Sequence, residues 1–484
     1  MQTLLGKSES VKRIVVLHLD LICLLLQLSV YAYVWFHTYY PFLSEPTYTV
    51  EGYPLGVGLK LQYRGHLLVL IVYLILLTFF TRTYGGLKIG YLKALEVFFS
   101  QIFALLLVNS ITYFQLSLMH NWLVPLPPML LVTALQLLLT FLWVAAANRI
   151  YVKVFPPRRL LLISDAYPAD DILNKFNSRK DRYVIEKCMN IAEGMEAVEE
   201  ECTKGYGGVV LWDIQTPLRN KLLKFCYSHA IRIYLSPRIP DVLLHGADQM
   251  HLFDTPLFFV RDYAMKTEQV VIKRLIDLVC SVVLIVLTSP LMLLAALIIK
   301  VYDGGPVLYR QTRCTLNGKQ FRILKFRSMR VDAEKDGVAR LARKNDDRIT
   351  PFGHVIRACR IDELPQLFNI LKGEMSFIGP RPERPEIIAQ YVESMPEFVF
   401  RMKVKAGLAG YAQVYGKYNT TPYDKLKLDL TYIENYSVWL DLKLMLLTLK
   451  ILFTPDATEG VDGSQTTALK EEEKEKKKEK ESGR

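Results

Sequence analysis

The first third of the chain is dominated by long apolar runs. Four of these runs lie near residues 14–35, 66–81, 95–118 and 127–148. Each is close to the roughly 20 residues that a helix needs to cross the hydrocarbon core of a bilayer. The first run is too long for a signal peptide and has no small-residue cleavage site. The pattern therefore predicts a four-helix transmembrane domain over residues 1–150.

The charged residues beside these runs predict their orientation. Basic residues precede the first run, fill the loop between the second and third, and follow the fourth: Lys7, Lys12, Arg13, Arg82, Lys88, Lys93, Arg149, Lys153, Arg158 and Arg159. The loop at 119–126 has no Lys or Arg, and the loop at 36–65 has only Lys60 and Arg64. Because cytoplasmic loops collect basic residues, the N-terminus and everything after the fourth helix are expected in the cytoplasm.

A different pattern follows, in which short apolar segments alternate with helical ones. The strand-like segments are 159–164, 183–185, 208–212 and 231–235. This alternation predicts a doubly wound parallel sheet, that is, a Rossmann-like α/β domain over 151–264. Its first turn, Ser164-Asp165-Ala166-Tyr167-Pro168, has none of the glycines that cradle a dinucleotide phosphate. We therefore expect a structural or regulatory domain without a cofactor.

A fifth apolar run covers residues 278–299 and contains Ser289-Pro290 near its middle. Proline removes a backbone donor and kinks a helix, and the serine hydroxyl could bond the carbonyl that is freed. Basic residues flank both ends of the run, with Lys273 and Arg274 before it and Lys300 after it. From this pattern alone, a kinked span and a re-entrant hairpin remain equally open.

The candidate chemistry lies further along, around an acidic pair. Asp362 and Glu363 stand at the start of an amphipathic helical pattern that Gly373 closes. The common explanation of such an aspartate is an ordinary helix N-cap. However, many cations surround the pair in sequence, namely Lys325, Arg327, Arg357, Arg360, Arg381 and Arg384. They exceed what capping needs, and planar guanidinium groups suit phosphate oxygens. The Gly-Pro-Arg-Pro run would present Arg381 on a fixed backbone.

Composition supports a membrane protein with a large water-facing part, because 51% of the residues are apolar and 22% are charged. The 60 Lys and Arg exceed the 48 Asp and Glu, which gives a net charge of +12. The excess suits membrane flanks and small phosphates, and without interleaved aromatic and basic residues we expect no nucleic acid partner.

The remaining composition signals exclude other classes. The seven cysteines are scattered with no C-x-x-C pair, so neither a zinc site nor a disulfide framework is expected. The end of the chain, 461–484, is predicted to be a disordered charged tail.

Several motifs in order complete the sequence picture: Asp303-Gly304-Gly305-Pro306, Lys325-Phe326-Arg327-Ser328-Met329, Asp362-Glu363-Leu364-Pro365-Gln366, Gly379-Pro380-Arg381-Pro382 and Lys405-Ala406-Gly407-Leu408-Ala409-Gly410. This set resembles the bacterial sugar transferase family, the monotopic polyprenyl-phosphate phosphoglycosyl transferases, over about 266–460. The order of membrane helices, α/β domain and transferase looks like the long form of that family. Ala406 and Tyr415-Gly416-Lys417 depart from the pattern of many members.

The resemblance implies a reaction. Asp362 would attack the sugar-bearing phosphorus of a UDP-sugar, release UMP and carry the phosphosugar until undecaprenyl phosphate takes it. Glu363 would help to hold Mg²⁺. Arg357 and Arg381 match phosphate-binding positions of the family, and we extend this role on charge to Lys325, Arg327, Arg360 and Arg384. For Asp424, Asp429 and Asp441 two interpretations are open, a metal-supporting acid and a solvated surface acid, and the second is favoured for each. This would be the first membrane step of capsule, exopolysaccharide or O-antigen assembly, with a hexose as the expected sugar.

The resemblance also implies an architecture and a location. It predicts a mainly α-helical monotopic transferase domain over 265–460, with a re-entrant helix at 271–300 broken at Ser289 and Pro290. The enzyme would be a multi-pass protein of the bacterial inner membrane with its catalytic domain in the cytoplasm, and a homodimer. The alternative is a non-catalytic membrane scaffold or regulator of polysaccharide export.

Overall fold

The computed structural model describes residues 2–45, 48–50, 53–55, 59–165, 169–331, 348–416 and 420–452. The predicted tail at 461–484, residues 166–168 of the first sheet turn, and Lys417 lie outside this part of the chain. The chain divides into two compact units, Met1–Ser236 and Pro237–Arg484, which are described separately below. The finer domain boundaries expected from the sequence stay predictions.

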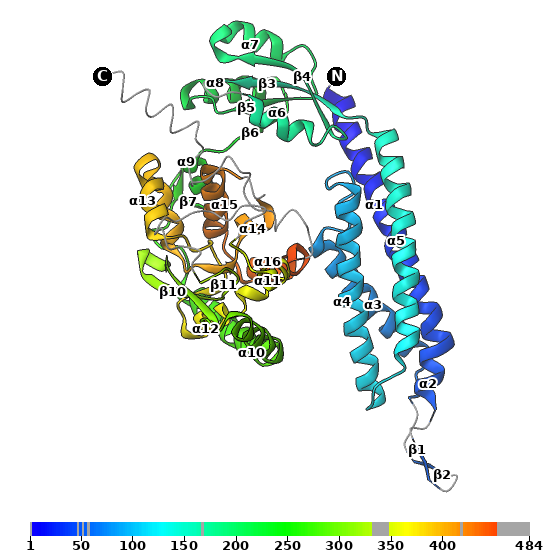
Figure 1. Ribbon diagram of the computed structural model, residues 1–484. Helices are drawn as coiled ribbons and strands as arrows, with labels where there is room; N and C mark the ends of the chain where they lie inside the picture. The colour runs from blue at the N-terminus through cyan, green and yellow to red at the C-terminus, as the bar shows by residue number, and fades with distance from the viewer. Residues whose placement is uncertain are drawn as a thin grey trace. The chain divides into compact units, whose positions relative to one another are not determined.

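The first unit begins with long apolar helices (Figure 1). They are α1 (Gln2–Val34), continued by the π-helical turn η1 (Trp35–Tyr39) and α2 (Tyr40–Ser44), then α3 (Tyr63–Tyr84), α4 (Ala94–His120) and α5 (Leu126–Val154). The short strands β1 (Tyr48–Val50) and β2 (Tyr53–Leu55) form an antiparallel pair before α3. Neighbouring helices pack side by side, α3 on α4, α4 on α5 and α1 on α5. By length and composition these helices are able to cross a membrane, as the apolar runs predict.

A cluster of neutral polar side chains lies inside this bundle. The Gln136 Nε2 amide on α5 donates to the Gln27 carbonyl of α1 at 2.9 Å and to the Tyr73 hydroxyl of α3 at 2.8 Å. The Gln136 Oε1 atom accepts from Asn109 Nδ2 of α4 at 2.9 Å. These side chains are almost fully buried. One glutamine thus joins all the long helices of the bundle through hydrogen bonds.

The rest of the first unit is a parallel sheet covered on both faces. Its elements are β3 (Arg158–Ser164), α6 (Asp170–Asn177), β4 (Tyr183–Asn190), η2 (Ile191–Glu193), α7 (Met195–Cys202), β5 (Gly208–Trp212), α8 (Thr216–Ser228) and β6 (Ile233–Leu235). The strand order is β4-β3-β5-β6, and every neighbouring pair is parallel. Alternate residues of β3 pack on α7 and α8 on one face and on α6 on the other. The predicted parallel sheet is therefore present, while the Rossmann-like assignment stays a prediction.

The second unit is mainly helical, with small sheets between the helices. Its elements are α9 (Ile239–His245), β7 (Asp248–Leu252), β8 (Thr255–Phe259), α10 (Thr267–Asp303), β9 (Leu308–Cys314), η3 (Leu316–Gly318), β10 (Gln320–Phe326), α11 (Pro351–Ala358), η4 (Ile361–Glu363), α12 (Gln366–Lys372), β11 (Ser376–Ile378), α13 (Pro385–Ser394), η5 (Pro396–Lys403), β12 (Gly407–Ala409), α14 (Tyr411–Tyr415), α15 (Pro422–Glu434) and α16 (Val438–Leu452). β9 and β10 form an antiparallel hairpin, and β11 pairs with β12 in parallel. The main apolar core of the unit lies around Ile370, Phe398 and Leu430, and a smaller one holds Ala295 and Ile299 of α10 against Ile356 of α11.

Helix α10 runs through the fifth apolar segment. The helix is continuous from Thr267 to Asp303 with Pro290 inside it, so the predicted break at Ser289-Pro290 is not seen as an interruption of the helix. Ser289 Oγ donates to the Val286 carbonyl at 2.8 Å. This is the carbonyl that the amide of residue 290 would bond if that residue were not proline. The expected compensation by Ser289 is therefore confirmed, and a re-entrant path of the helix stays a prediction.

An ion pair and several hydrogen bonds attach the first half of α10 to the rest of the second unit. Lys273 Nζ lies 2.5 Å from Asp441 Oδ2 of α16 and donates to the Ile378 carbonyl at 2.8 Å. Asp277 accepts from the Phe377 amide at 2.9 Å. Arg274 donates to the carbonyls at the end of α12, including the Ile370 carbonyl at 2.6 Å. The helix is thereby attached to β11, which leads directly into the turn that carries Arg381.

Candidate active site

The acidic pair lies on a short 3-10 turn between two helices. α11 ends at Ala358, and Arg360 then adopts a left-handed backbone with φ of 56°. Such a conformation costs a non-glycine residue about 1 kcal/mol and is enriched at functional sites. The turn η4 follows and carries Asp362 and Glu363. The N-cap of α12 is Pro365, and neither η4 nor α12 has a side-chain cap bond. The N-cap explanation of Asp362 is therefore wrong.

Glu363 lies at the centre of three cations. Its Oε1 atom is 2.9 Å from Lys325 Nζ, 3.2 Å from Arg381 Nη2 and 3.7 Å from Arg360 Nη1. Burial acts to raise the pKa of Glu363, but the attraction of Lys325, Arg381 and Arg360 outweighs it and holds the pKa well below its ordinary range. Glu363 is therefore an ionised carboxylate at any physiological pH.

Asp362 has the opposite character, although it is the next residue. Its side chain is buried, with 8% exposed. Burial, together with the negative charge of Glu363, raises the pKa of Asp362 to about 6, against the opposing attraction of Lys325, Arg357 and Arg360. Two neighbouring carboxyl groups with pKa values pushed apart are typical of sites in which the two acids have different roles.

Arg381 is carried by a turn with a closely packed backbone. β11 ends at Ile378, and a Cβ atom on Gly379 would lie 2.3 Å from the Lys405 carbonyl oxygen, so only glycine fits there. The carbonyl of Arg381 accepts from Arg401 Nη2 at 3.0 Å. The Arg381 side chain remains 36% exposed while it reaches Glu363. It is therefore both fixed at its base and accessible to a ligand.

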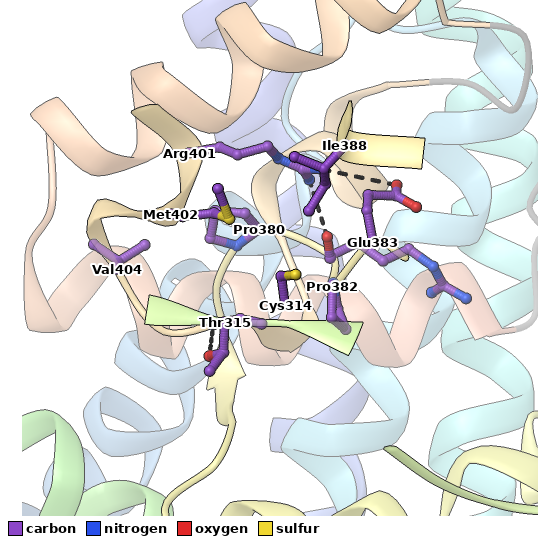
Figure 2. A pocket seen from close by; sticks show the side chains of 11 residues that line it. Cys314, Thr315, Pro380, Pro382, Glu383, Ile388, Arg401, Met402 and Val404 are labelled. Carbon is purple, nitrogen blue, oxygen red and sulfur yellow. Dashed lines mark hydrogen bonds and ion pairs between the residues drawn. The ribbon is translucent and has the colours of Figure 1, made fainter. Parts of the chain in front are cut away.

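A small pocket lies behind this turn (Figure 2). Its lining includes Cys314, Thr315, Pro380, Pro382, Glu383 and Arg401. Arg401 is buried and pairs with Asp429, with Nη2 at 2.7 Å from Oδ2. The pocket is thus lined by the turn itself, Arg381 included, and by residues that support it, and Asp362 is not among the residues that line it.

The predicted site residues divide into two groups. Lys325, Arg357, Arg360 and Arg381 act on the acidic pair through contacts or charge, as described above. Arg327 is buried beside Gly305, because a Cβ at Gly305 would lie 2.6 Å from Arg327 Nη1. The charge of Arg384 acts on Arg313, whose pKa it helps to lower. Phosphate binding by each of these residues stays a prediction.

Two other acids in the second unit, Asp429 and Asp441, are buried, contrary to the sequence expectation. Asp429 and Asp441 are 1% and 4% exposed, so their interpretation as solvated surface acids is wrong. Asp429 pairs with Arg401, and Asp441 pairs with Lys273 and accepts from the Tyr432 hydroxyl at 2.7 Å. No local sequence pattern signals these pairs, because the partners lie 28 and 168 residues apart in the chain.

The carboxyl groups of Asp362 and Glu363 are compatible with binding of a divalent cation. Mg²⁺ is commonly bound by one or two carboxylates together with substrate phosphates and water. Among the described residues there is no group of three or more His, Cys, Asp or Glu that would enclose a metal by itself. The contacts of Lys325, Arg360 and Arg381 all reach Oε1 of Glu363, on one side of the carboxylate. The pair therefore fits a metal that is shared with a phosphate ligand.

Comparison with known proteins agrees with this geometry. The profile described as bacterial sugar transferase matches residues 268–455. Over 189 residues, 38% of this chain, the sequence is 43% identical to a UDP-glucose:undecaprenyl-phosphate glucose-1-phosphate transferase of Caulobacter vibrioides, of which the match covers 70%. It is 44% identical over 186 residues to a UDP-N-acetylgalactosamine-undecaprenyl-phosphate N-acetylgalactosaminephosphotransferase of Aeromonas hydrophila.

These matches cover only part of this chain and part of each relative. The match covers 38% of this chain and 44% of the Aeromonas protein. A UDP-glucose:undecaprenyl-phosphate glucose-1-phosphate transferase of Escherichia coli strain K12 is 38% identical over 226 residues, 43% of this chain and 47% of that protein. The chain thus matches less than half the length of these two relatives.

Proposed function

This chain belongs to the bacterial sugar transferase family, and we propose that it transfers a sugar-1-phosphate from a UDP-sugar to undecaprenyl phosphate and releases UMP. The observation that carries the proposal is the arrangement around the acidic pair. Among the described residues, the charges of Lys325, Arg357, Arg360 and Arg381 act on the two adjacent carboxyl groups. Cations thus outnumber acids at the pair itself, which suits a diphosphate ligand.

The two carboxylates have separate roles in this proposal. Asp362 is the nucleophile, because a pKa of about 6 leaves it mostly ionised at pH 7 while it is more basic than an ordinary aspartate. Its oxygen forms a bond to the sugar-bearing phosphorus, and the bond from that phosphorus to UMP breaks. A phosphate oxygen of undecaprenyl phosphate then attacks the same phosphorus and releases Asp362. The product is undecaprenyl diphosphate-sugar, and the aspartate is regenerated.

Glu363 would hold Mg²⁺ together with the substrate diphosphate. When bound, the ion neutralises charge on the phosphate oxygens so that an anion can approach them. The chain's own residues contribute the rest. Arg381 and Lys325 orient the phosphates, and their ion pairs with Glu363 fix where those positive charges lie.

We place the site at the inner leaflet of the bacterial inner membrane, with α10 as a re-entrant segment. The first half of α10 contacts β11 and α16 through Lys273, and its second half packs Ala295 and Ile299 against the same unit. Between them, Val286, Leu287 and Leu293 are at least 66% exposed. Because a spanning helix separates its ends by about 30 Å of hydrocarbon, two ends on one compact unit support entry and exit on the cytoplasmic side.

Further parts of the proposal rest on family likeness. We propose a hexose as the transferred sugar, a homodimer as the assembly, and capsule, exopolysaccharide or O-antigen synthesis as the pathway. A structural or regulatory role is proposed for the parallel sheet of the first unit. The alternative, a non-catalytic scaffold, is less favoured because a decayed site would not need two buried acids surrounded by cations.

The test is an assay of UMP release. The full-length protein would be incubated with Mg²⁺, undecaprenyl phosphate and each of several UDP-sugars. We expect release with one sugar or a small set of sugars, and loss of release in Asp362→Asn. A folded native protein that releases UMP from no UDP-sugar would favour the scaffold. Unchanged release by Asp362→Asn would refute the nucleophile while leaving the family intact.

A further inference from the structure

The turn that carries Arg381, residues 379–385, is held by both side-chain and main-chain donors elsewhere in the unit. Three of its seven residues are prolines, whose nitrogens cannot donate. The carbonyls of four successive residues accept from outside the turn: Pro380 from the Gly407 amide at 2.9 Å, Arg381 from Arg401 Nη2 at 3.0 Å, Pro382 from Arg313 Nη1 at 3.1 Å, and Glu383 from the Cys314 amide at 3.0 Å. The two guanidinium donors bond the carbonyls of Arg381 itself and of the next residue, so the path of the turn at Arg381 depends on where those arginines lie.

The carboxylate of Glu383 lies beside both of these arginines. Its oxygens are 3.6 Å from Arg313 Nη1 and 3.8 Å from Arg401 Nη1, and Lys425 Nζ is 3.2 Å away. The Glu383 side chain is only 14% exposed. Burial opposes its charge, but the combined attraction of Lys425, Arg401 and Arg313 keeps the pKa of Glu383 below its ordinary value. Glu383 is therefore ionised at neutral pH and places a negative charge within the turn.

Arg313 depends on this anion more than Arg401 does. Arg401 has a second buried partner in Asp429, at 2.7 Å. For Arg313, burial lowers the pKa to about 10, the charges of Arg381 and Arg384 act in the same direction, and Glu383 is the main opposing charge. Without the Glu383 carboxylate, the buried Arg313 guanidinium would be repelled by Arg381 and Arg384 with little water to screen the charges. Loss of its bond to the Pro382 carbonyl is the expected consequence.

We propose that Glu383 is the positioning residue for Arg381. It holds Arg313 and Arg401 against the turn, and the turn in consequence presents the Arg381 guanidinium to Glu363 at 3.2 Å. The Glu383 carboxylate does not touch the reacting phosphate in this role; it acts through the backbone of the residues before it. The inference rests on the proposed phosphosugar transfer, in which Arg381 orients the substrate phosphates.

A positioning role and a general stabilising role make different predictions for a double-mutant cycle. If Glu383 acts through Arg381, its removal changes nothing further once the Arg381 side chain is gone. If Glu383 only stabilises the fold, its removal lowers the melting temperature and the folded fraction, with equal effect in either background. The isosteric change Glu383→Gln removes the charge and keeps the volume, which limits the loss of packing.

The experiment compares native protein, Glu383→Gln, Arg381→Ala and the double variant, all full length in lipid nanodiscs. UMP release is measured per folded enzyme with the preferred UDP-sugar, Mg²⁺ and undecaprenyl phosphate. We expect Glu383→Gln to lower kcat about 10- to 100-fold, because small misplacements of an orienting group cost this much. In the Arg381→Ala background, the same change is expected to lower kcat by less than about twofold.

The control is Glu386→Gln, which changes an exposed acid three residues further along. It is expected to leave kcat and KM within about twofold of the native values. Equal fold losses from Glu383→Gln in both backgrounds, or a native kcat per folded Glu383→Gln enzyme, would overturn the positioning role. Absence of UMP release by the native protein would instead refute the proposed function, so the two failures are distinguishable.

Discussion

The helical bundle and the region of the acidic pair bury polar side chains in opposite ways. In the bundle, Gln27, Tyr73, Asn109 and Gln136 are neutral, and the Gln136 side chain takes part in three hydrogen bonds between helices. Around Asp362 and Glu363 the buried groups are charged, and positive charges outnumber negative ones. Neutral amides satisfy one another without leaving a net field, whereas the charged cluster leaves an attraction for a further anion.

The neutral cluster in the bundle has a structural role, whereas the charged cluster around Glu363 is suited to binding and reaction. Hydrogen bonds between neutral groups in a bundle contribute modestly, and they fix which helix faces meet. A charged cluster with unequal signs costs stability, and proteins retain such clusters where they bind or react. The account therefore predicts that changes in the bundle affect stability alone, and changes around Glu363 affect turnover.

Among changes that leave the acidic pair intact, the largest effect is expected from Lys325→Met. This change removes the nearest cation of Glu363, at 2.9 Å, and one positive charge from the proposed phosphate site. We expect kcat/KM for the UDP-sugar to fall by about 10²- to 10³-fold, as when one preorganised donor is removed from an active site. Lys325→Arg is the matched control and should retain more activity than Lys325→Met. A kcat/KM within threefold of native for folded Lys325→Met would contradict the charged-cluster account.

Asp362→Asn is expected to stabilise the folded protein while it abolishes turnover. The pKa of Asp362 is about 6 in the folded protein, against 3.8 for an unperturbed aspartate. Stability is therefore lost as the pH rises between these two values, and the full cost of ionising Asp362 applies above pH 6. At pH 7.5 the cost is on the order of 3 kcal/mol, from the two-unit difference. Thermal melting should therefore show a higher melting temperature for Asp362→Asn at pH 7.5, with a smaller gain at pH 5. A lower melting temperature at pH 7.5 would argue against the raised pKa of the buried Asp362.

Gln136→Leu in the bundle should have the opposite profile. It removes the bonds to Gln27, Tyr73 and Asn109 and leaves those groups without one partner each, at a cost of about 2 kcal/mol. We expect a lower melting temperature and a kcat per folded enzyme within about twofold of native. Leu138→Ala, on the exposed side of the same helix, is the control and should change stability less. A large loss of kcat in folded Gln136→Leu would show that the bundle takes part in turnover.

The smallest effect is expected from pH. Because Asp362 must be ionised to attack, kcat/KM should fall as the pH falls through about 6 and be about tenfold lower at pH 5 than at pH 7. Glu363 contributes nothing to this change, since its pKa is held far lower by Lys325, Arg381 and Arg360. A profile that is flat between pH 5 and pH 7 would contradict the assignment of the nucleophile.

Much of this arrangement could be predicted from local sequence. The long apolar helices follow from run length, and the bond from Ser289 to the Val286 carbonyl follows from the proline rule. The acidic pair and the arginines near it were recognisable by their number and residue type. The helices, the Ser289 bond and the adjacency of Asp362 and Glu363 are each set by residues within a few positions of one another.

What could not be predicted depends on tertiary packing. Asp429 and Asp441 look like surface acids in sequence, and only the fold brings them to Arg401 and Lys273, 28 and 168 residues away. The left-handed backbone at Arg360 moves the acidic pair off the start of α12 and onto its own turn. The Gly-Pro-Arg-Pro run distinguishes Arg381, but it does not show that Arg381 reaches Glu363 while the charge of Arg384 acts on Arg313.

The central claim is that Asp362 carries the phosphosugar, and one measurement tests it most directly. Native protein would be mixed with the UDP-sugar and Mg²⁺ in the absence of undecaprenyl phosphate, and both UMP and the peptide that contains Asp362 would be quantified. The account predicts a burst of at most one UMP per protein and a sugar-phosphate adduct on Asp362 that disappears when undecaprenyl phosphate is added. UMP release that requires the lipid acceptor from the start, with no adduct and no burst, would contradict it.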